Sequence, residues 1–267
     1  SVQEAASCFS PYNFNLDNYT SNSVTLDWTE AGSATNWNIV YGTPGFDPTS
    51  TGTTVTANST NFTVSSLTPG TNYDFYVQAD CGGSTSGFTG PINISTNCNA
   101  ISSFPYTETF EDGSASRDCW RQYRKTGNKN WSFDEGSSGG SVLNAYAGSK
   151  NARFTSSSGG PHKTFLISPV LDLSSGIYEL SYYFAQEEYF SFQNELKVYY
   201  RTSSTDAWTE ISHQSSEVST WTNETFQLPN TSATYQIAFE GIDNWGHANV
   251  IDNVEVSLIT CPAPIID

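Results

Sequence analysis

The chain has 267 residues and a formal net charge of −17, with 14% charged and 14% aromatic residues. Nucleic acid and anionic membranes repel so acidic a protein, which excludes both as partners. Seven tryptophans, 15 tyrosines and 16 phenylalanines supply ample apolar surface for a core, which excludes a disordered chain. The sequence has no apolar run of about 18 residues, so we expect no membrane insertion.

Short alternating segments in the first hundred residues predict an antiparallel β-sandwich. The expected strands are 24–28, 37–41, 53–55, 62–64, 74–79 and 92–94. The string L-x-P-x-T-x-Y, from Leu67 to Tyr73, predicts a tyrosine corner in which the Tyr73 hydroxyl bonds back to the chain a few residues upstream. Such a corner identifies an architecture and no chemistry.

This region, about residues 8–96, resembles a fibronectin type III domain. The resemblance rests on the core tryptophan, the strand-C tyrosine and the corner, at Trp28, Tyr41, Leu67, Pro69 and Tyr73. The ending 79–82 is similar to the variety found in secreted multidomain proteins of Bacteroidetes-type bacteria. The resemblance implies a spacer or a binding module, because this fold carries many functions.

A second all-β pattern begins at Phe104 and continues to about Leu258, with no trustworthy helical periodicity. Its expected strands are 166–168, 178–184, 196–201, 225–228, 235–240 and 251–256. The Gly/Ser runs 136–141 and 156–160 are expected to be loops, since strands resume on both sides.

This half resembles the MAM-like jelly rolls, including the cleaved-adhesin and choice-of-anchor J modules of secreted bacterial proteins. The matching segments are 110–111, 119–120, 168–173, 181–184, 196–198, Trp208 and 251–254. It departs from animal MAM domains in carrying two cysteines instead of four, and from many relatives in a Glu where they have Asp before the strand at Leu196. We therefore expect an all-β chain: a fibronectin type III β-sandwich over 1–97 and a MAM-like jelly-roll sandwich over 98–260. We expect 261–267 to begin a following module, so that neighbouring modules of the parent protein are covalent partners.

The five cysteines indicate an oxidising environment. Cys8 and Cys81 bracket the first domain, Cys98 and Cys119 bracket the start of the second, and Cys261 is left over. Pairing within modules gives the disulfides Cys8–Cys81 and Cys98–Cys119 in a secreted or cell-surface protein. The alternative is five free thiols in the cytosol; no CxxC or Cys/His spacing indicates a metal.

The most specific chemical prediction from the sequence is a structural Ca²⁺ site. The first and last strands of a jelly roll lie side by side, so Glu111 and Asp252 can converge, and in the resembling adhesin modules these positions hold calcium. Glu195 is the candidate for a third carboxylate, and Asp112 or a backbone carbonyl for a fourth. The alternative is a pair of solvated carboxylates on adjacent strands.

The candidate ligand site is the loop 241–249. Trp245 is its expected stacking platform, and Asp243, Asn244 and His247 are its expected hydroxyl partners. A second aromatic loop offers Tyr189 and Phe192 as another wall. The alternative is that Trp245 packs over the rim of the sandwich. The tryptophans expected in the core are Trp120, Trp131, Trp208 and Trp221.

We expect no catalytic activity, since the three histidines lie in separate loops and no HExxH or GxSxG motif occurs. The second domain is expected to bind carbohydrate or a cell-surface glycoconjugate, with the first domain as spacer. Two alternatives stay open at this point. One is adhesion to an extracellular protein, and the other is an accessory region of a secreted protease or glycoside hydrolase.

Overall fold

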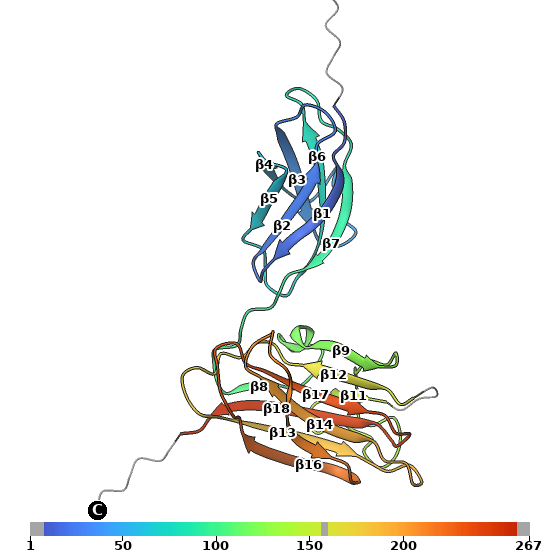
Figure 1. The fold of residues 1–267 in the computed structure, drawn as a ribbon. Helices are drawn as coiled ribbons and strands as arrows, with labels where there is room; N and C mark the ends of the chain where they lie inside the picture. Colours follow the sequence, from blue (N-terminus) through green and yellow to red (C-terminus); the bar gives the residue numbers. More distant parts are fainter. Residues whose placement is uncertain (1–7, 156–159, 261–267) are drawn as a thin grey trace, which may run out of the picture. The chain divides into compact units, whose positions relative to one another are not determined.

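The computed structural model describes residues 8–155 and 160–260. The chain divides into two compact units, Ser1–Asn99 and Ala100–Asp267, both built from antiparallel sheets (Figure 1). The all-β prediction is confirmed: within the described ranges the one helical element is a 3₁₀ turn, Arg117–Cys119. No helix in this part of the chain has the length and apolar character needed to cross a bilayer. The predicted module start at 261–267, with Cys261, lies outside the described residues.

The first unit is a sandwich of two sheets with seven strands. One sheet has the order β1-β2-β5 and the other the order β4-β3-β6-β7. The strands are β1 Tyr12–Tyr19, β2 Ser23–Thr29, β3 Asn36–Gly42, β4 Thr53–Ala57, β5 Asn61–Ser65, β6 Asn72–Asp80 and β7 Thr89–Ser95. Each of the six predicted strand segments lies within one of the strands β2 to β7. β1 was not predicted, because its side chains are mostly exposed and two register shifts interrupt its pairing with β2.

The predicted tyrosine corner is present in the first unit. The Thr68 N–H donates to the Tyr73 hydroxyl over 3.1 Å, while the Tyr73 ring packs against Tyr41 and Phe75. A disulfide joins Cys8 to Cys81, as predicted. It ties the start of the described chain to the residue that follows β6.

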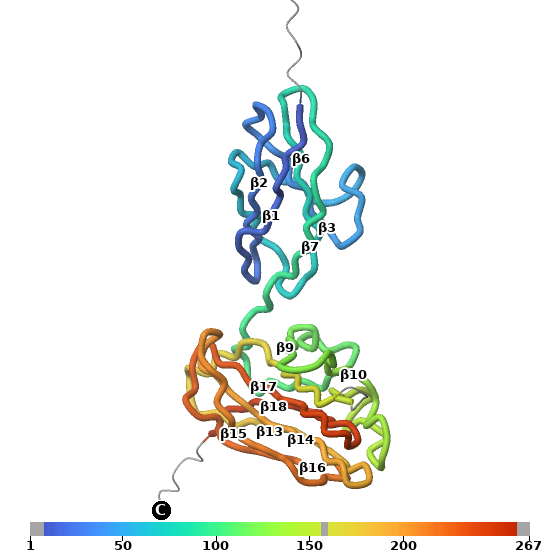
Figure 2. The backbone as a smooth tube through the Cα atoms, turned by 45° about the vertical axis from the view of Figure 1, so that its right-hand side comes forward, coloured from blue at the N-terminus to red at the C-terminus, as the bar shows by residue number. Residues whose placement is uncertain are grey.

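The second unit also consists of two sheets. One has the order β10-β11-β18-β13-β16, with β8 also paired to β18, and the other the order β15-β14-β17-β12-β9. The strands are β8 Tyr106–Glu108, β9 Arg121–Thr126, β10 Ser132–Asp134, β11 Asn151–Phe154, β12 Lys163–Ile167, β13 Tyr178–Gln186, β14 Glu195–Arg201, β15 Thr209–Gln214, β16 Val218–Gln227, β17 Gln236–Ile242 and β18 Asn249–Leu258. Both backbone views show β13, β14, β17 and β18 lying along one common direction (Figure 2). The first and last strands pair directly, Glu108 opposite Val254, as expected for a jelly roll.

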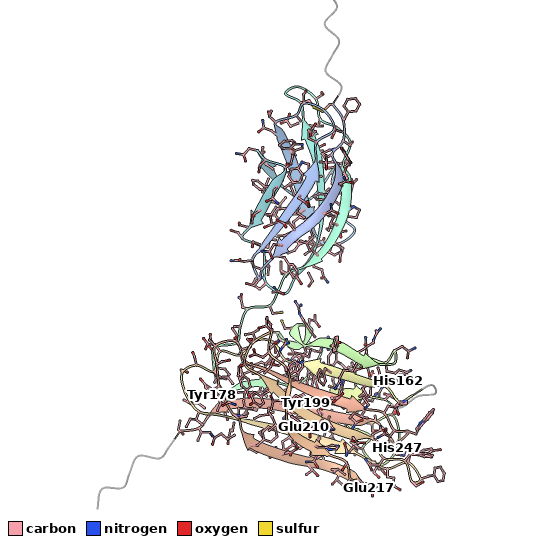
Figure 3. The ribbon with its side chains drawn as sticks, in the orientation of Figure 1. His162, Tyr178, Tyr199, Glu210, Glu217 and His247 are labelled. Atoms are coloured by element: carbon pink, nitrogen blue, oxygen red, sulfur yellow. A yellow bond between two sulfur atoms is a disulfide. The ribbon has the colours of Figure 1, made fainter. Side chains whose placement is uncertain are left out.

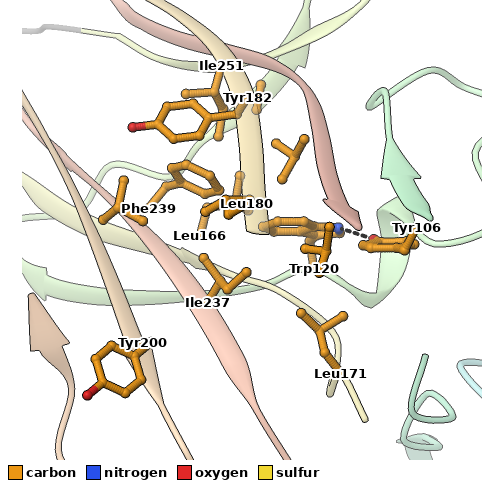
Figure 4. Packing of buried hydrophobic residues seen from close by; sticks show 14 of the residues in the cluster. Tyr106, Trp120, Leu166, Leu171, Leu180, Tyr182, Tyr200, Ile237, Phe239 and Ile251 are labelled. Atoms are coloured by element: carbon orange, nitrogen blue, oxygen red, sulfur yellow. Dashed lines mark hydrogen bonds between the residues drawn. The ribbon is translucent and has the colours of Figure 1, made fainter. Parts of the chain in front are cut away.

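Apolar side chains from both sheets form the core of the second unit (Figure 4). Trp120 packs on Phe239 in this core and donates its Nε1–H to the Tyr106 hydroxyl over 3.0 Å. Trp131 is also buried, as predicted. Trp208 and Trp221 were wrongly predicted to be core residues. Both are partly exposed, because they lie on the outward faces of the two sheets.

Cys98 and Cys119 are both disulfide-bonded, like Cys8 and Cys81. All four cysteines of the described chain are therefore oxidised. This agrees with the oxidising environment that the cysteine count predicts.

Candidate functional site

Three loops meet at one end of the second unit. They are the segment 136–141, the β13–β14 connection 187–194 and the β17–β18 connection 243–248. The buried Asn194 holds two of them together, because its Oδ1 accepts hydrogen bonds from the N–H groups of Asn244 and Gly246 at 2.8 and 2.9 Å. The Ser141 hydroxyl donates to Glu187 over 2.9 Å and attaches the third loop. Figure 3 shows His247 at this end and Tyr178 at the opposite end.

Four aromatic side chains point into solvent from these loops, and we call them the aromatic tip. They are Tyr189, Phe190, Phe192 and Trp245, with exposed fractions of 47%, 82%, 48% and 43%. Trp245 is therefore exposed, although more than half of its surface is still covered by the protein. The two predicted aromatic loops do lie together, since Gly246 approaches the backbone of Phe192 and Asn194 too closely for any side chain.

The backbone of the aromatic tip is strained at Phe190 and at Trp245. Tyr189 and Phe192 exchange backbone hydrogen bonds of 3.0 and 2.9 Å across a tight turn, which places Phe190 at φ +57°. Trp245 has φ +74°. Bulky residues rarely adopt this left-handed conformation, and where they do the strain commonly serves a function. The sequence named Tyr189 and Phe192 but missed Phe190, which the turn exposes most.

The predicted polar partners of Trp245 behave differently from one another. Asp243 was predicted to contact ligand, but it is fully buried and its Oδ1 accepts the Trp245 N–H over 2.9 Å. The Asn244 amide donates to Glu195 Oε1 over 3.0 Å. These two residues therefore position the loop. His247 is partly exposed, with its ring 5.1 Å from that of Tyr189.

The carboxylates of Glu111 and Asp252 converge on the loop 146–150. Glu111 accepts the N–H groups of Ser149 and Lys150, both at 2.7 Å, and the Ser149 hydroxyl at 2.8 Å. Asp252 accepts the N–H of Ala147 at 3.1 Å. Gly148 has φ +70°, and a Cβ there would overlap the Glu111 carboxylate, so the loop requires glycine at this position.

The two carboxylates of this pair differ in their electrostatics. Burial raises the pKa of Asp252 to about 6, and the nearby charge of Glu111 adds to the effect. Burial acts against ionisation of Glu111 too, but the N–H groups of Lys150 and Ser149 outweigh it and lower that pKa. The buried Oδ1 of the adjacent Asn253 has no hydrogen-bond partner in the structure and is a further candidate oxygen. Calcium is bound by oxygen ligands, so these three side chains are the candidates for such an ion.

The other two predicted ligands of this cation have partners of their own. Glu195 begins β14 in the other sheet, where its Oε2 lies 2.6 Å from His213 Nε2. Asp112 forms an ion pair with Arg117 at 2.7 Å. Over residues 8–155 and 160–260 there is no group of three His, Cys, Asp or Glu side chains that could hold a metal. Of the predicted ligands, Glu111 and Asp252 are the two that share the loop 146–150 as hydrogen-bond partner.

Comparison with known proteins assigns both halves. The fibronectin type III domain family matches residues 9–95, and the family described as MAM domain, meprin/A5/mu, matches residues 109–262. Comparison with curated proteins gives no match.

Three solved structures illustrate the similarity. The K1 cleaved adhesin domain of Lys-gingipain from Porphyromonas gingivalis W83 is 22% identical over 59% of this chain and 100% of its own, with a TM-score of 0.47. The K2 cleaved adhesin domain of Lys-gingipain is 20% identical over 58% of this chain and 99% of its own, with a TM-score of 0.46. The fn3 domain of the human collagen alpha-1(XX) chain is 20% identical over 39% of this chain and 99% of its own, with a TM-score of 0.31.

Proposed function

Because this chain belongs to the MAM domain family and carries a fibronectin type III domain ahead of its MAM domain, we propose that it binds carbohydrate through the aromatic tip. Both families consist of non-catalytic modules, which supports a binding role. The observation that carries the proposal is the exposure of four aromatic rings on loops that hydrogen bonds hold in place. We further propose that the fibronectin type III unit is a spacer and that the parent protein is secreted or displayed on the cell surface.

The chemistry of the aromatic tip suits a saccharide. A pyranose ring presents an apolar C–H face that stacks on an aromatic ring and hydroxyl groups that need polar partners. Trp245 supplies the stacking surface, and the Tyr189 and His247 rings, 5.1 Å apart, belong to the same group of loops. Because Asn194 and Asp243 fix the loop backbone, little ordering is required when the ligand binds.

A glycan array tests this proposal. Trp245→Ala is expected to weaken retention of the chain about fivefold, since stacking of one ring contributes on the order of 1 kcal/mol. The melting temperature is expected to change little, because Trp245 is 43% exposed. Ile177→Ala is the matched control, as Ile177 is 54% exposed and lies outside the three loops. Unfolding of Trp245→Ala, or unchanged retention by it, would contradict the proposal.

A protein partner is the second candidate, and Phe190 is the observation that favours it. An 82% exposed phenyl ring on a tight turn suits insertion into an apolar pocket of another protein. An array of extracellular-matrix proteins separates the two functions. Loss of a protein ligand in Phe190→Ser, with no wild-type glycan retention, would replace the carbohydrate proposal with this one.

We also propose that Glu111 and Asp252 hold a structural Ca²⁺. When bound, the ion would supply positive charge next to a buried carboxylate whose pKa is raised. The residues themselves link three parts of the fold: Asp252 lies on β18, Glu111 follows β8, and both bind the backbone of the loop 146–150. Binding would therefore add to the free energy of unfolding of the second unit.

A further inference from the structure

A shallow groove lies on the outer face of the five-stranded sheet, and we call it the sheet groove. Its lining residues are Tyr123, Lys125, Phe165, Tyr199 and Trp208, and its volume is about 380 Å³. They come from β9, β12 and β14 and from the residue before β15. Sites for small ligands typically measure roughly 300–1,000 Å³, so the sheet groove has the size for one or two sugar units.

The aromatic rings of the sheet groove are held by one another and by the sheet. Phe165 lies 5.2 Å from Tyr199 and 5.5 Å from Trp208, measured between ring centroids. The Arg201 guanidinium covers one side of Trp208 at 4.5 Å. Tyr123 pairs with Phe165 across β9 and β12 and is 60% exposed. The Tyr123 ring does not pack in the core of the unit, so its exposed surface can contact a ligand.

The polar groups of the sheet groove are fixed by a buried carboxylate. Glu240 on β17 is 1% exposed; its Oε1 lies 2.8 Å from Lys125 Nζ, and its Oε2 accepts the Tyr199 hydroxyl over 2.8 Å. Burial and the charge of Glu240 raise the pKa of Tyr199, so its phenol stays neutral. The Lys125 ammonium also lies 4.8 Å from the Phe165 ring centre. Donors are thus held in place beside apolar rings.

The two lysines near the sheet groove are each paired with a carboxylate. Lys125 pairs with Glu240, and Lys197 pairs with Glu210 at 2.9 Å. Tyr199 and Glu210 lie close together near the middle of the unit in Figure 3, where the Tyr199 hydroxyl is 3.3 Å from the Glu210 carboxylate. With both lysines paired, the apolar rings and the fixed hydrogen-bond donors are the main features that the groove offers a ligand. A neutral ligand with hydroxyl groups and an apolar face matches this surface.

We propose that the sheet groove binds a neutral pyranose unit of a polysaccharide, as a second carbohydrate subsite separate from the aromatic tip. The class of ligand rests on the proposed function, but the residues are independent of it. Tyr123 and Trp208 contact the C–H faces of the sugar, and Lys125 donates to its hydroxyl groups. Because strands carry the site, its geometry is more rigid than that of a loop site.

Affinity electrophoresis of the whole chain tests the proposal, in gels that contain a soluble β-glucan, xylan, galactomannan or dextran. Tyr123→Ala is expected to weaken retardation by at least one of these polymers roughly fivefold to tenfold, the loss expected for one stacked ring. Trp245→Ala removes the stacking surface of the aromatic tip. This variant is expected to keep the share of the retardation that Tyr123→Ala removes. Ile177→Ala serves as the exposed apolar control.

A second variant controls for a loss of binding that is caused by unfolding of Tyr123→Ala. Lys125→Met combined with Glu240→Gln removes the ion pair and keeps the apolar stem over Phe165, so it is expected to remain folded and to weaken retardation like Tyr123→Ala. If both variants run like the wild type, or no polymer retards the wild type, the sheet groove proposal is overturned. A loss of retardation in Trp245→Ala alone would overturn the sheet groove proposal and support binding at the aromatic tip. Loss in the two groove variants alone would support the sheet groove and overturn the aromatic tip.

Discussion

The buried carboxylate of Asp252 should make the stability of the second unit depend on pH in an unusual direction. Its pKa is about 6 in the folded state, against an ordinary value of 3.8. The folded state therefore binds this proton more tightly than the unfolded chain, and the free energy of unfolding falls as pH rises from about 4 to about 6. At 1.36 kcal/mol per pH unit the loss amounts to about 3 kcal/mol.

Denaturant unfolding in EDTA at pH 4, 5, 6 and 7 measures this effect when the wild type is compared with Asp252→Asn. The variant keeps the shape of the side chain and removes its proton, so the other titrating groups cancel in the comparison. We expect the stability of the wild type relative to the variant to fall by about 3 kcal/mol across this range. A difference that stays constant with pH would refute the assignment of a raised pKa to Asp252.

Three further outcomes are expected. Calcium at neutral pH should raise the melting temperature of the second unit alone. A melting temperature that changes with neither EDTA nor calcium, together with no metal on elemental analysis, would contradict a metal at Glu111 and Asp252. Gly148→Ala should destabilise the same unit by about 1–3 kcal/mol through backbone strain and contact with Glu111, and an unchanged melting temperature would show that the loop relaxes. Tyr73→Phe should cost the first unit about 1 kcal/mol, the worth of one hydrogen bond, in calorimetry; a neutral substitution would mean that the corner depends on the ring alone.

The strands with strict alternation were predictable from the sequence, because one buried face imposes a period of two on them. β2 and β14 show this pattern along their whole length. β9 and β15 were missed because they are edge strands with mostly polar side chains, and only their pairing with β12 and β14 makes them strands.

The candidate sites were predictable only as far as strand pairing determines them. The approach of Glu111 to Asp252 follows from the pairing of β8 with β18, which the resemblance implied. The meeting of the two aromatic loops depends on Asn194, an amide in a loop with no sequence pattern to mark it. Trp208 was misplaced for a related reason: a tryptophan just before a short polar strand gives no sign of which face of the sheet it covers.

The position of β9 also bears on edge-to-edge pairing between copies of the chain. An edge strand offers unpaired N–H and C=O groups to any other strand, and charged side chains are one means of discouraging such pairing. β9 has the sequence RQYRKT and carries three cationic side chains in an otherwise strongly acidic chain. Its exposed Tyr123 is thus flanked by positive charges that repel the β9 strand of a second copy, while an uncharged polysaccharide meets no such barrier.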